Sequence, residues 1–423
     1  MLSQEQNEML TRVGKGTPMG ELLRRYWFPV GTTADLKDKY TKKVRLLGED
    51  LVLYRDRSGN IGLIQEKCPH RGVSMVYGFP EEEGLRCQYH GWCFNNHGQC
   101  TDQPNEPEES TFKDRVKISA YPIQEMGGLY WTYMGPEPAP LLPRFDGFAL
   151  KNSIRLIGQT VIPVNWLQIM ENSMDPIHTE WLHGHYDSYQ KEMRGEENHS
   201  PFLRKHDKIA FDRFEYGLVK RRLLKGMSED TDDWKVGHPV LFPYTLSVGG
   251  TAGPGSYAFQ MRIPMDDTHT WHVWYTSYAI PDGVEIPESL QGTKMYDVPY
   301  LLENGEYRLD FIDGQDIMCW ITQGSIADRT DEKLGTTDKG IILYRQVLKE
   351  QIDKVAAGED PLGTVRDPEK NLFIQLPLEK KKHHFSHGFR DITTRFHTRF
   401  APNVEELIEF FEKREKEEKV GSH

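Results

Sequence analysis

The apolar positions of the first third of the chain change from a helical to a strand-like spacing. Residues 3–25 carry apolar and charged side chains at roughly helical intervals, which predicts a helical lead-in. From Val44 to about Tyr133, short apolar runs are separated by Gly, Asn, Asp and Pro. These runs begin at Val44, Leu51, Ile61 and Leu129. The pattern predicts a small all-β domain after the lead-in.

A proline-rich segment follows this predicted domain. Pro136, Pro138, Pro140 and Pro143 favour a stiff, extended connector of the kind that joins two domains. We therefore predict a first domain over residues 1–145 and a second over residues 146–420.

The second part alternates strand-like and helical patterns. The strand-like runs are Ile154 to Ile162, Lys208 to Leu223, Val240 to Val248, Tyr257 to Ile263 and Thr270 to Ala279. Helical patterns lie around 165–184, 314–323, 337–357 and 403–418. A curved antiparallel sheet that grips helices is the simplest packing of these elements, so the predicted fold class is α+β.

Composition narrows the functional class. The chain has 52 basic and 64 acidic side chains and a net charge of −12, which disfavours nucleic acid and anionic membranes as partners. The first residues lack the pattern of a secretory signal, and no apolar run is long enough to span a bilayer. We therefore expect a cytoplasmic protein. Cys93, Cys100 and Cys319 suggest no disulfide framework and are interpreted as ordinary thiols.

Two short motifs each supply one thiolate and one imidazole. Cys68 and His70 form the first pair, and Cys87 and His90 form the second. A single zinc site more often pairs two close cysteines with a separate histidine pair. Mixed pairs suit a cluster in which one iron takes two Cys and the other takes two His, as in Rieske [2Fe-2S] centres. A zinc knuckle or a chance pattern is the alternative.

A second metal site is indicated further along the chain. His178 and His183 lie five residues apart, or ~140° on an ideal helix, so their rings can meet only if the helix is distorted or their side chains reach around. Asp316 is the best distant carboxylate and Asp313 the second choice. Two His and one carboxylate on one face leave open positions on Fe(II) for O2 and substrate. The alternatives are buried structural histidines and a helix-capping role for Asp316.

Asp175 and Pro176 mark a break in this helical region. Asp followed by Pro is typical of a helix start, so one helix is predicted to end there and another to begin. Asp175 also lies three residues before His178.

The order of these motifs resembles the catalytic α subunit of Rieske non-haem iron oxygenases. Residues 68–92 carry the cluster pattern, and residues 171–183, 315–320 and 328–335 complete the resemblance over nearly the whole chain. Residues 16–27 and 45–51 are similar to the phthalate dioxygenase branch. The resemblance implies an N-terminal Rieske domain and a helix-grip (START-like) catalytic domain. It also implies two cofactors, a [2Fe-2S] cluster and a mononuclear Fe(II).

The resemblance further implies partners and a route for electrons. An NAD(P)H-dependent flavin and iron-sulfur reductase would reduce the cluster, and electrons would leave through His70 or His90. Asp175 resembles the family's bridging aspartate, a catalytic role between a cluster histidine of one subunit and an iron ligand of the next. A trimer or a dimer of trimers is therefore expected.

The predicted reaction is hydroxylation, in the form of cis-dihydroxylation, of an aromatic, carboxylated substrate with O2. Arg204 is a candidate partner for a substrate carboxylate, although it could equally belong to a solvated loop. Members of this branch that hold two carboxylates use a pair of arginines, but no second arginine can be placed here, and Leu241 and Phe242 lie in an apolar stretch, which argues against phthalate itself. The alternatives are an O- or N-dealkylating monooxygenase and a Rieske electron-transfer protein whose second site is inert.

Overall fold

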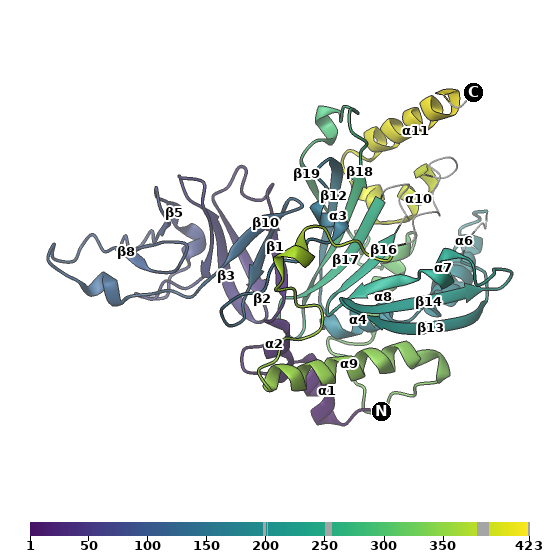
Figure 1. Ribbon diagram of the computed structural model, residues 1–423, viewed down its shortest axis with the longest axis horizontal. Helices are drawn as coiled ribbons and strands as arrows, with labels where there is room; N and C mark the ends of the chain where they lie inside the picture. The colour runs from purple at the N-terminus through teal and green to yellow at the C-terminus, as the bar shows by residue number, and fades with distance from the viewer. Residues whose placement is uncertain (198–199, 201, 250–255, 379–388, 422–423) are drawn as a thin grey trace.

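The computed structural model describes residues 1–423 except 198–199, 201, 250–255, 379–388 and 422–423. Its described strands form one eight-stranded sheet and three smaller sheets (Figure 1). The smaller sheets use residues before 134, and the large sheet uses residues after 152. The α+β prediction with an N-terminal β domain is confirmed.

The lead-in forms two short helices, α1 (Gln4–Thr11) and α2 (Pro18–Leu23). Ser3 caps α1 through a capping box with Gln6. Thr17 caps α2, whose first residue is Pro18, where a missing N–H costs nothing. Leu10, Leu22 and Leu23 are fully buried, so the lead-in belongs to the main core.

Three small sheets make up the β domain. Their strand orders are β1-β11-β10, β2-β3-β4-β9 and β5-β6-β7-β8. The strands are β1 (Trp27–Thr32), β2 (Thr41–Leu46), β3 (Glu49–Arg55), β4 (Ile61–Gln65), β5 (Phe79–Pro80), β6 (Leu85–Arg86), β7 (Cys93–Phe94), β8 (Cys100–Asp102), β9 (Ala120–Tyr121), β10 (Ile123–Met126) and β11 (Leu129–Tyr133). The sheet that contains β5 and β8 lies at the far left end of the molecule in Figure 1.

The large sheet has the order β13-β14-β15-β16-β17-β18-β12-β19 and is antiparallel except for the β12–β19 pair. The strands are β12 (Ser153–Ile162), β13 (His206–Phe214), β14 (Gly217–Leu224), β15 (His238–Leu241), β16 (Thr245–Gly249), β17 (Ser256–Pro264), β18 (Thr270–Ala279) and β19 (Thr293–Asp297).

Two segments that were predicted as single strands each form two strands in the structure. Lys208 to Leu223 is a hairpin that turns at residues 215–216, because Gly217 adopts a φ of 152° that a residue with a Cβ rarely adopts. Val240 to Val248 is also broken, between β15 and β16, at the Phe242–Pro243 bond. Gly217 and Pro243 are turn signals at these two places, but the prediction of single strands followed the apolar residues on either side of them.

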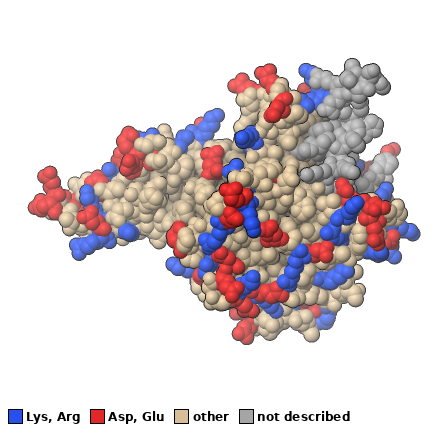
Figure 2. Space-filling view, in the orientation of Figure 1, with Lys and Arg blue, Asp and Glu red and all other residues tan. Residues whose placement is uncertain are grey.

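Helices pack against the large sheet and along its ends (Figure 1). The longer ones are α4 (Trp166–Ser173), α6 (Asp187–Met193), α8 (Ile312–Thr322), α9 (Lys339–Ala356), α10 (Phe389–Arg395) and α11 (Val404–Gly421). The short ones are α3 (Asp146–Ala149), α5 (His178–Glu180) and α7 (Asp232–Lys235). None of the helices in the described ranges is long and apolar enough to cross a membrane. Figure 2 shows acidic and basic side chains interspersed on the visible face, without a broad basic patch.

A buried ion network holds α4 in place. The Glu171 carboxylate accepts hydrogen bonds from Arg329 at 2.7 Å and from Arg345 at 2.6 Å. Arg345 also forms a two-point ion pair with Glu332, and Arg329 donates to the Asn7 side chain of α1. The exposed fractions of Glu171, Arg329 and Arg345 are only 7%, 1% and 5%. The network therefore ties α4 to α1 and α9 where water cannot replace a lost partner.

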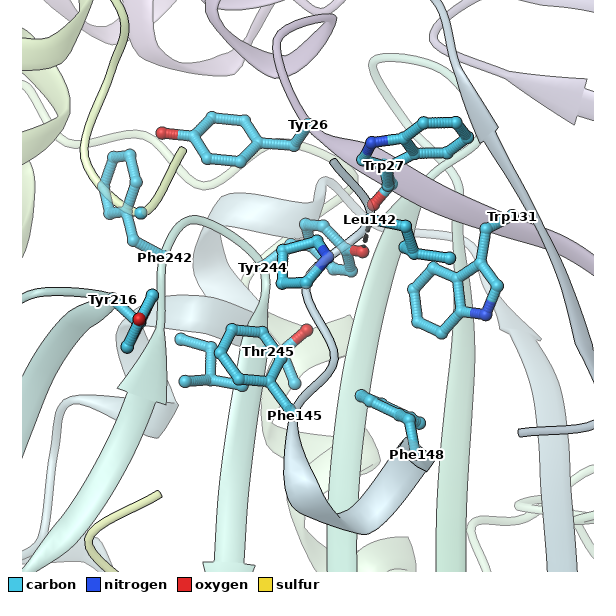
Figure 3. A pocket seen from close by; sticks show the side chains of 13 residues that line it. Tyr26, Trp27, Trp131, Leu142, Phe145, Phe148, Tyr216, Phe242, Tyr244 and Thr245 are labelled. Carbon is cyan, nitrogen blue, oxygen red and sulfur yellow. Dashed lines mark hydrogen bonds between the residues drawn. The ribbon is translucent and has the colours of Figure 1, made fainter. Parts of the chain in front are cut away.

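An aromatic cavity lies between the β domain and the large sheet. Figure 3 shows Trp27 and Trp131 from the β domain facing Phe148, Tyr244 and other residues of the second part. The Tyr244 hydroxyl donates a hydrogen bond to the Trp27 carbonyl oxygen at 2.5 Å. None of the residues that line the cavity is acidic, basic or a histidine. The cavity is therefore part of an apolar junction and offers no ligand for a metal.

Candidate metal centres

Cys68 and Cys87 begin two loops with the same backbone hydrogen bonds. Each Cys N–H donates to the carbonyl oxygen five residues later, at 2.9 Å for Cys68 and 2.8 Å for Cys87. The glycine four residues after each Cys, Gly72 or Gly91, donates back to the Cys carbonyl at 2.8 or 3.0 Å. Both glycines have positive φ, 72° and 76°, which closes the turn without a Cβ.

The two loops bring four potential ligands together. Both cysteines are buried, and the Cys68 and Cys87 thiols lie within hydrogen-bond reach of each other. The rings of His70 and His90 lie 4.5 Å apart, and His70 stacks on Trp92 at 4.4 Å. Two buried sulfurs beside two imidazoles near the surface fit the mixed ligand set of a Rieske cluster. Burial raises the pKa of the Cys68 thiol to about 11, so binding iron must displace a proton from it.

The second site combines residues from two separated helical segments. His178 begins α5, and His183 lies in η3 (Trp181–Tyr186), a π-helical turn that continues into α6. A π-helix has i to i+5 hydrogen bonds, so it changes the relative direction of residues five apart. The predicted local distortion is confirmed. Asp316 comes from α8, and the ligand atoms of the three residues lie within 4.8 Å of one another.

The distances in this triad fit one metal ion. His183 Nε2 lies 3.3 Å from one Asp316 carboxylate oxygen, and His178 Nε2 lies 3.7 Å from the other. The two rings are 5.4 Å apart and nearly perpendicular. Two His and one carboxylate that converge in this way match the facial triad of non-haem Fe(II) enzymes.

Charge coupling within the triad favours the carboxylate form of Asp316. Burial opposes ionisation of Asp316, but the nearby His183 and His178 outweigh it and lower the pKa of Asp316. Burial also opposes protonation of His183, yet Asp316 raises the pKa of His183 above its usual value. Without a cation the two groups share a proton, and a bound divalent ion takes the place of that positive charge.

Gln315 orients His183 from the adjacent position of α8. Its Oε1 lies 3.0 Å from His183 Nδ1, and its Nε2 donates to Asp187 at 2.9 Å. An amide oxygen can only accept, so His183 must carry its proton on Nδ1 and leave Nε2 free for a metal. Asn172 donates to Asp316 at 3.4 Å from α4. Gln315 lies within the Gln-Asp motif at residues 315–316, but sequence reasoning gave it no role.

We expect Gln315→Leu to weaken iron binding at the triad by roughly 10- to 100-fold, because outer hydrogen bonds of this kind tune metal affinity. Titration of the iron-depleted protein with Fe(II) under anaerobic conditions measures the change. Gln323→Leu, at the exposed end of the same helix, is the matched control and should bind iron like the unmodified protein. Equal affinities for the two variants would contradict the orienting role of Gln315.

Asp175 caps the helical segment and also faces His178. Its Oδ1 accepts a hydrogen bond from Ile177 N–H at 2.8 Å, and its Oδ2 lies 3.5 Å from His178 Nδ1. Burial raises its pKa, but the close approach of His178 lowers it by more. The predicted helix break is present, since α4 ends at Ser173 and α5 begins at His178.

Asp313, the second-choice ligand, belongs to a different network. Its carboxylate accepts hydrogen bonds from Trp274 Nε1 and from the His397 backbone N–H, both at 2.8 Å. His397 Nδ1 lies 2.9 Å from the Tyr296 hydroxyl. Asp313 belongs to α8, and its carboxylate faces the sheet and not the histidine pair.

Buried neutral histidines make stability depend on pH. Burial lowers the pKa of His397 to about 3 and that of His238 to about 4. An unfolded histidine titrates near about 6.5, so between these values the unfolded chain binds more protons. The stabilising effect of the neutral histidines is therefore fully present above about pH 6.5, and the free energy of unfolding falls as the pH decreases toward 4.

Lowering the pH from 6.5 to 5 is expected to reduce the free energy of unfolding by about 2 kcal/mol for each of these histidines. Urea unfolding at pH 7 and pH 5 measures this loss. His397→Asn should reduce the pH dependence, and the exposed His97→Asn should leave it unchanged. Identical pH dependence in both variants would contradict a neutral, buried His397.

Arg204, the predicted carboxylate partner, lies in an exposed segment before β13. In the described part of the chain no hydrogen bond or ion pair is recorded for it, and it lines none of the described cavities. Its role in substrate binding stays a prediction. Other cations, which sequence reasoning missed, lie on the sheet face beneath the triad.

Comparison with known proteins places this chain in a family. Residues 26–122 match the Rieske [2Fe-2S] domain family, and residues 293–384 match the family "LigXa C-terminal domain like". The 5,5'-dehydrodivanillate O-demethylase oxygenase subunit of Sphingobium sp. (strain NBRC 103272 / SYK-6) is 44% identical over 380 residues, which cover 89% of this chain and 87% of that protein.

Two further proteins show the same relationship. The phthalate 4,5-dioxygenase oxygenase subunit of Pseudomonas putida is 32% identical over 400 residues, or 86% of this chain and 89% of that protein. The oxygenase of carbazole 1,9a-dioxygenase, solved in a reduced complex with ferredoxin, aligns with a TM-score of 0.57 and 19% identity. The alignment covers 82% of this chain and 93% of that one and shows the shared fold.

The chain belongs to the Rieske non-haem iron oxygenases. It is a terminal oxygenase component, and its cofactors are a Rieske [2Fe-2S] cluster and a mononuclear non-haem Fe(II).

Proposed function

We propose that this oxygenase removes a methyl group from an aryl methyl ether that also carries a carboxylate. The converging triad of His178, His183 and Asp316 carries the proposal, because two His and one carboxylate leave coordination positions open on a bound metal. The choice of O-demethylation rests on the 44% identity to the dehydrodivanillate O-demethylase subunit.

The proposal assigns each group of ligands to one cofactor. The cluster ligands are Cys68, His70, Cys87 and His90, and the mononuclear ligands are His178, His183 and Asp316. When bound, the two iron groups supply the electrons and the open coordination positions that activate O2. Residues 1–145 serve as the electron-transfer domain and residues 146–420 as the catalytic domain.

The overall reaction balances with two electrons. An aryl methyl ether, O2, two electrons and two protons give a phenol, formaldehyde and water. One C–H bond of the methyl group becomes a C–O bond, and the methyl C–O bond to the ring oxygen then breaks. Gln315 and Asn172 keep the ligand side chains oriented, and the packing of α4 and α8 limits access of water.

The second candidate reaction is cis-dihydroxylation of an aromatic carboxylate. It is favoured by the 32% identity to the phthalate 4,5-dioxygenase subunit. The predicted dihydroxylation and the alternative dealkylation thus use the same site and differ in which substrate atom faces the iron.

Turnover of 5,5'-dehydrodivanillate with ¹⁸O2 separates these reactions. O-demethylation gives formaldehyde in proportion to O2 uptake and a phenol without the label. Dihydroxylation gives a diol with two labelled oxygens. A diol product would overturn the proposed demethylation, and reduction of the chain without substrate-dependent O2 uptake would support an inert second site.

We also propose that electrons pass between subunits of a trimer or a dimer of trimers. The sheet that contains β5 and β8, near the cluster loops, lies at the opposite end of the molecule from α8 (Figure 1). A route within one chain would have to cross that span. The carbazole oxygenase complex with ferredoxin supports an external electron donor, here a reductase that is dependent on NAD(P)H.

We expect Asp175→Asn to retain both cofactors but to slow electron transfer between them, because an amide cannot carry the charge that pairs with two histidines. Stopped-flow reoxidation of the reduced cluster, in the presence of O2 and substrate, measures this rate. Asp207→Asn, an exposed carboxylate on β13, is the matched control and should leave this rate unchanged. An unchanged reoxidation rate in Asp175→Asn would rule out the bridging role.

A further inference from the structure

The sheet face beneath the triad can be identified from strand register. Trp274 donates its indole N–H to Asp313 of α8, so its side chain lies on the α8 face. Directly paired residues share a face, and Gln260 pairs with Trp274. The pairing continues from Gln260 through Leu246 and Val240 to Leu218 on β14. Lys220 and Arg262 lie two residues from Leu218 and Gln260, so both side chains occupy this face.

The face also borders an internal space. A cavity of about 100 Å³ lies against it, between Gln260 and Trp274 on the sheet and His397 on the other side. Unlike the aromatic junction in Figure 3, this cavity is on the α8 side of the sheet. Because α8 carries Asp316, this face of the sheet lies toward the helix that supplies one ligand of the triad.

Two of the cations on this face already have internal partners. Arg222 Nε lies 3.2 Å from Asp233, which also pairs with His238 at 3.0 Å. The Arg262 guanidinium donates to the side-chain and backbone oxygens of Gln260 at 2.8 and 2.6 Å. Both groups are thereby fixed in position.

Lys220 differs from these two arginines. Within the described ranges, its ammonium group has no hydrogen-bond or ion-pair partner, whereas Arg222 pairs with Asp233. The group is nevertheless close enough to Asp175 and Asp316 to be influenced by their charges. Burial, with a smaller effect of Arg222, lowers the pKa of Lys220 to about 7, as is usual for a cation that lacks a close anion. Iron in the triad would add positive charge and increase the need for an anion.

We propose that Lys220 is the residue that binds the carboxylate of the aromatic substrate and so sets the preference for acids. The inference rests on the proposed function, since it requires a carboxylated substrate beside the triad. Lysine binds a carboxylate as a point charge, and the charge of Arg262, which also influences Lys220, adds to the positive field. Lys220 would thus hold the ring while the methyl ether, elsewhere on the ring, faces the metal.

Binding constants of the iron-replete protein test this assignment without turnover. Calorimetry under anaerobic conditions compares two acids, 5,5'-dehydrodivanillate and phthalate, with their dimethyl esters. We expect Lys220→Met to weaken binding of the favoured acid by roughly 10- to 100-fold, since a hydrogen bond to a charged group is lost. Binding of the ester should be unchanged, and Lys220→Arg should recover most of the affinity. Lys225→Met, an exposed lysine directly after β14, is the matched control and should bind both forms like the unmodified protein, while Arg204→Gln tests the rival assignment.

Each other outcome is decisive. If Lys220→Met binds the acid normally while the unmodified protein prefers acid to ester, the assignment fails and the proposed function stands. If Arg204→Gln alone loses the preference, the carboxylate partner is Arg204. If Lys220→Met loses mononuclear iron, Lys220 serves the metal site instead. If the unmodified protein binds neither acid, the proposed substrate class fails and the assignment fails with it.

Discussion

Replacing His183 by alanine is expected to abolish substrate oxidation while the cluster stays intact. His183 is 3% exposed, and its Nε2 lies 3.3 Å from Asp316, so no neighbouring group can take its place as a ligand. Two remaining ligands hold a divalent ion weakly. The iron content should fall from about three to about two per chain. Metal analysis, the visible spectrum of the cluster and O2 uptake with substrate measure the three quantities.

His185→Ala is the matched control for this experiment. His185 lies in the same π-helical turn, but its side chain is exposed and contacts the Trp181 ring. We expect this variant to keep its iron and its activity. Loss of the cluster spectrum in His183→Ala would mean that the two metal sites have been assigned to the wrong residues.

Replacing Glu171 by glutamine is expected to cause the largest loss of stability. Glu171 accepts from both Arg329 and Arg345, and all three side chains are buried. Removing the charge leaves two buried guanidinium groups without their shared partner, which costs about 3–5 kcal/mol in comparable cases. Because Asn172 follows Glu171 on α4, loosening α4 should also disturb Asp316. Scanning calorimetry of the iron-replete protein measures the shift in unfolding temperature.

The exposed ion pair between Arg213 and Glu350 provides the comparison. Like the Glu171 network, it joins a guanidinium to a carboxylate, with contact distances of 2.6 and 2.9 Å. Its two side chains, however, are 45% and 37% exposed. Glu350→Gln should cost about 0–1 kcal/mol, because water replaces the lost partner. Equal unfolding temperatures for the two variants would show that burial of the Glu171 network contributes little.

The ligand sets could be predicted from sequence because they depend on local spacing. Cys68 and His70 share one turn, as do Cys87 and His90, so their proximity needs no knowledge of the fold. The spacing of His178 and His183 called for either a distorted helix or side chains that reach around, and the π-helical turn provides the first of these. Asp316 was found through its motif, and the structure brings it to the histidines from α8.

Other features depend on tertiary contacts and could not be predicted in this way. The role of Gln315 requires that α8 lie against η3, where its amide reaches His183. The position of Lys220 depends on which face of β14 meets α8, which is set by strand register across five strands. The hairpin within Lys208 to Leu223, by contrast, turns directly before Gly217, a turn signal that was given too little weight in the sequence-based prediction. Arg204 was chosen by residue type alone, without knowledge of its exposure.

The most direct test of the central claim is a single turnover of the isolated chain. The fully reduced, iron-replete protein is mixed with O2 and 5,5'-dehydrodivanillate in the absence of any reductase. The cluster and the mononuclear iron each supply one electron, so we expect up to about one formaldehyde per mononuclear iron, together with oxidation of the cluster. Oxidation of the cluster without any product from this or another aromatic acid would contradict the claim that this chain contains the catalytic oxygenase centre.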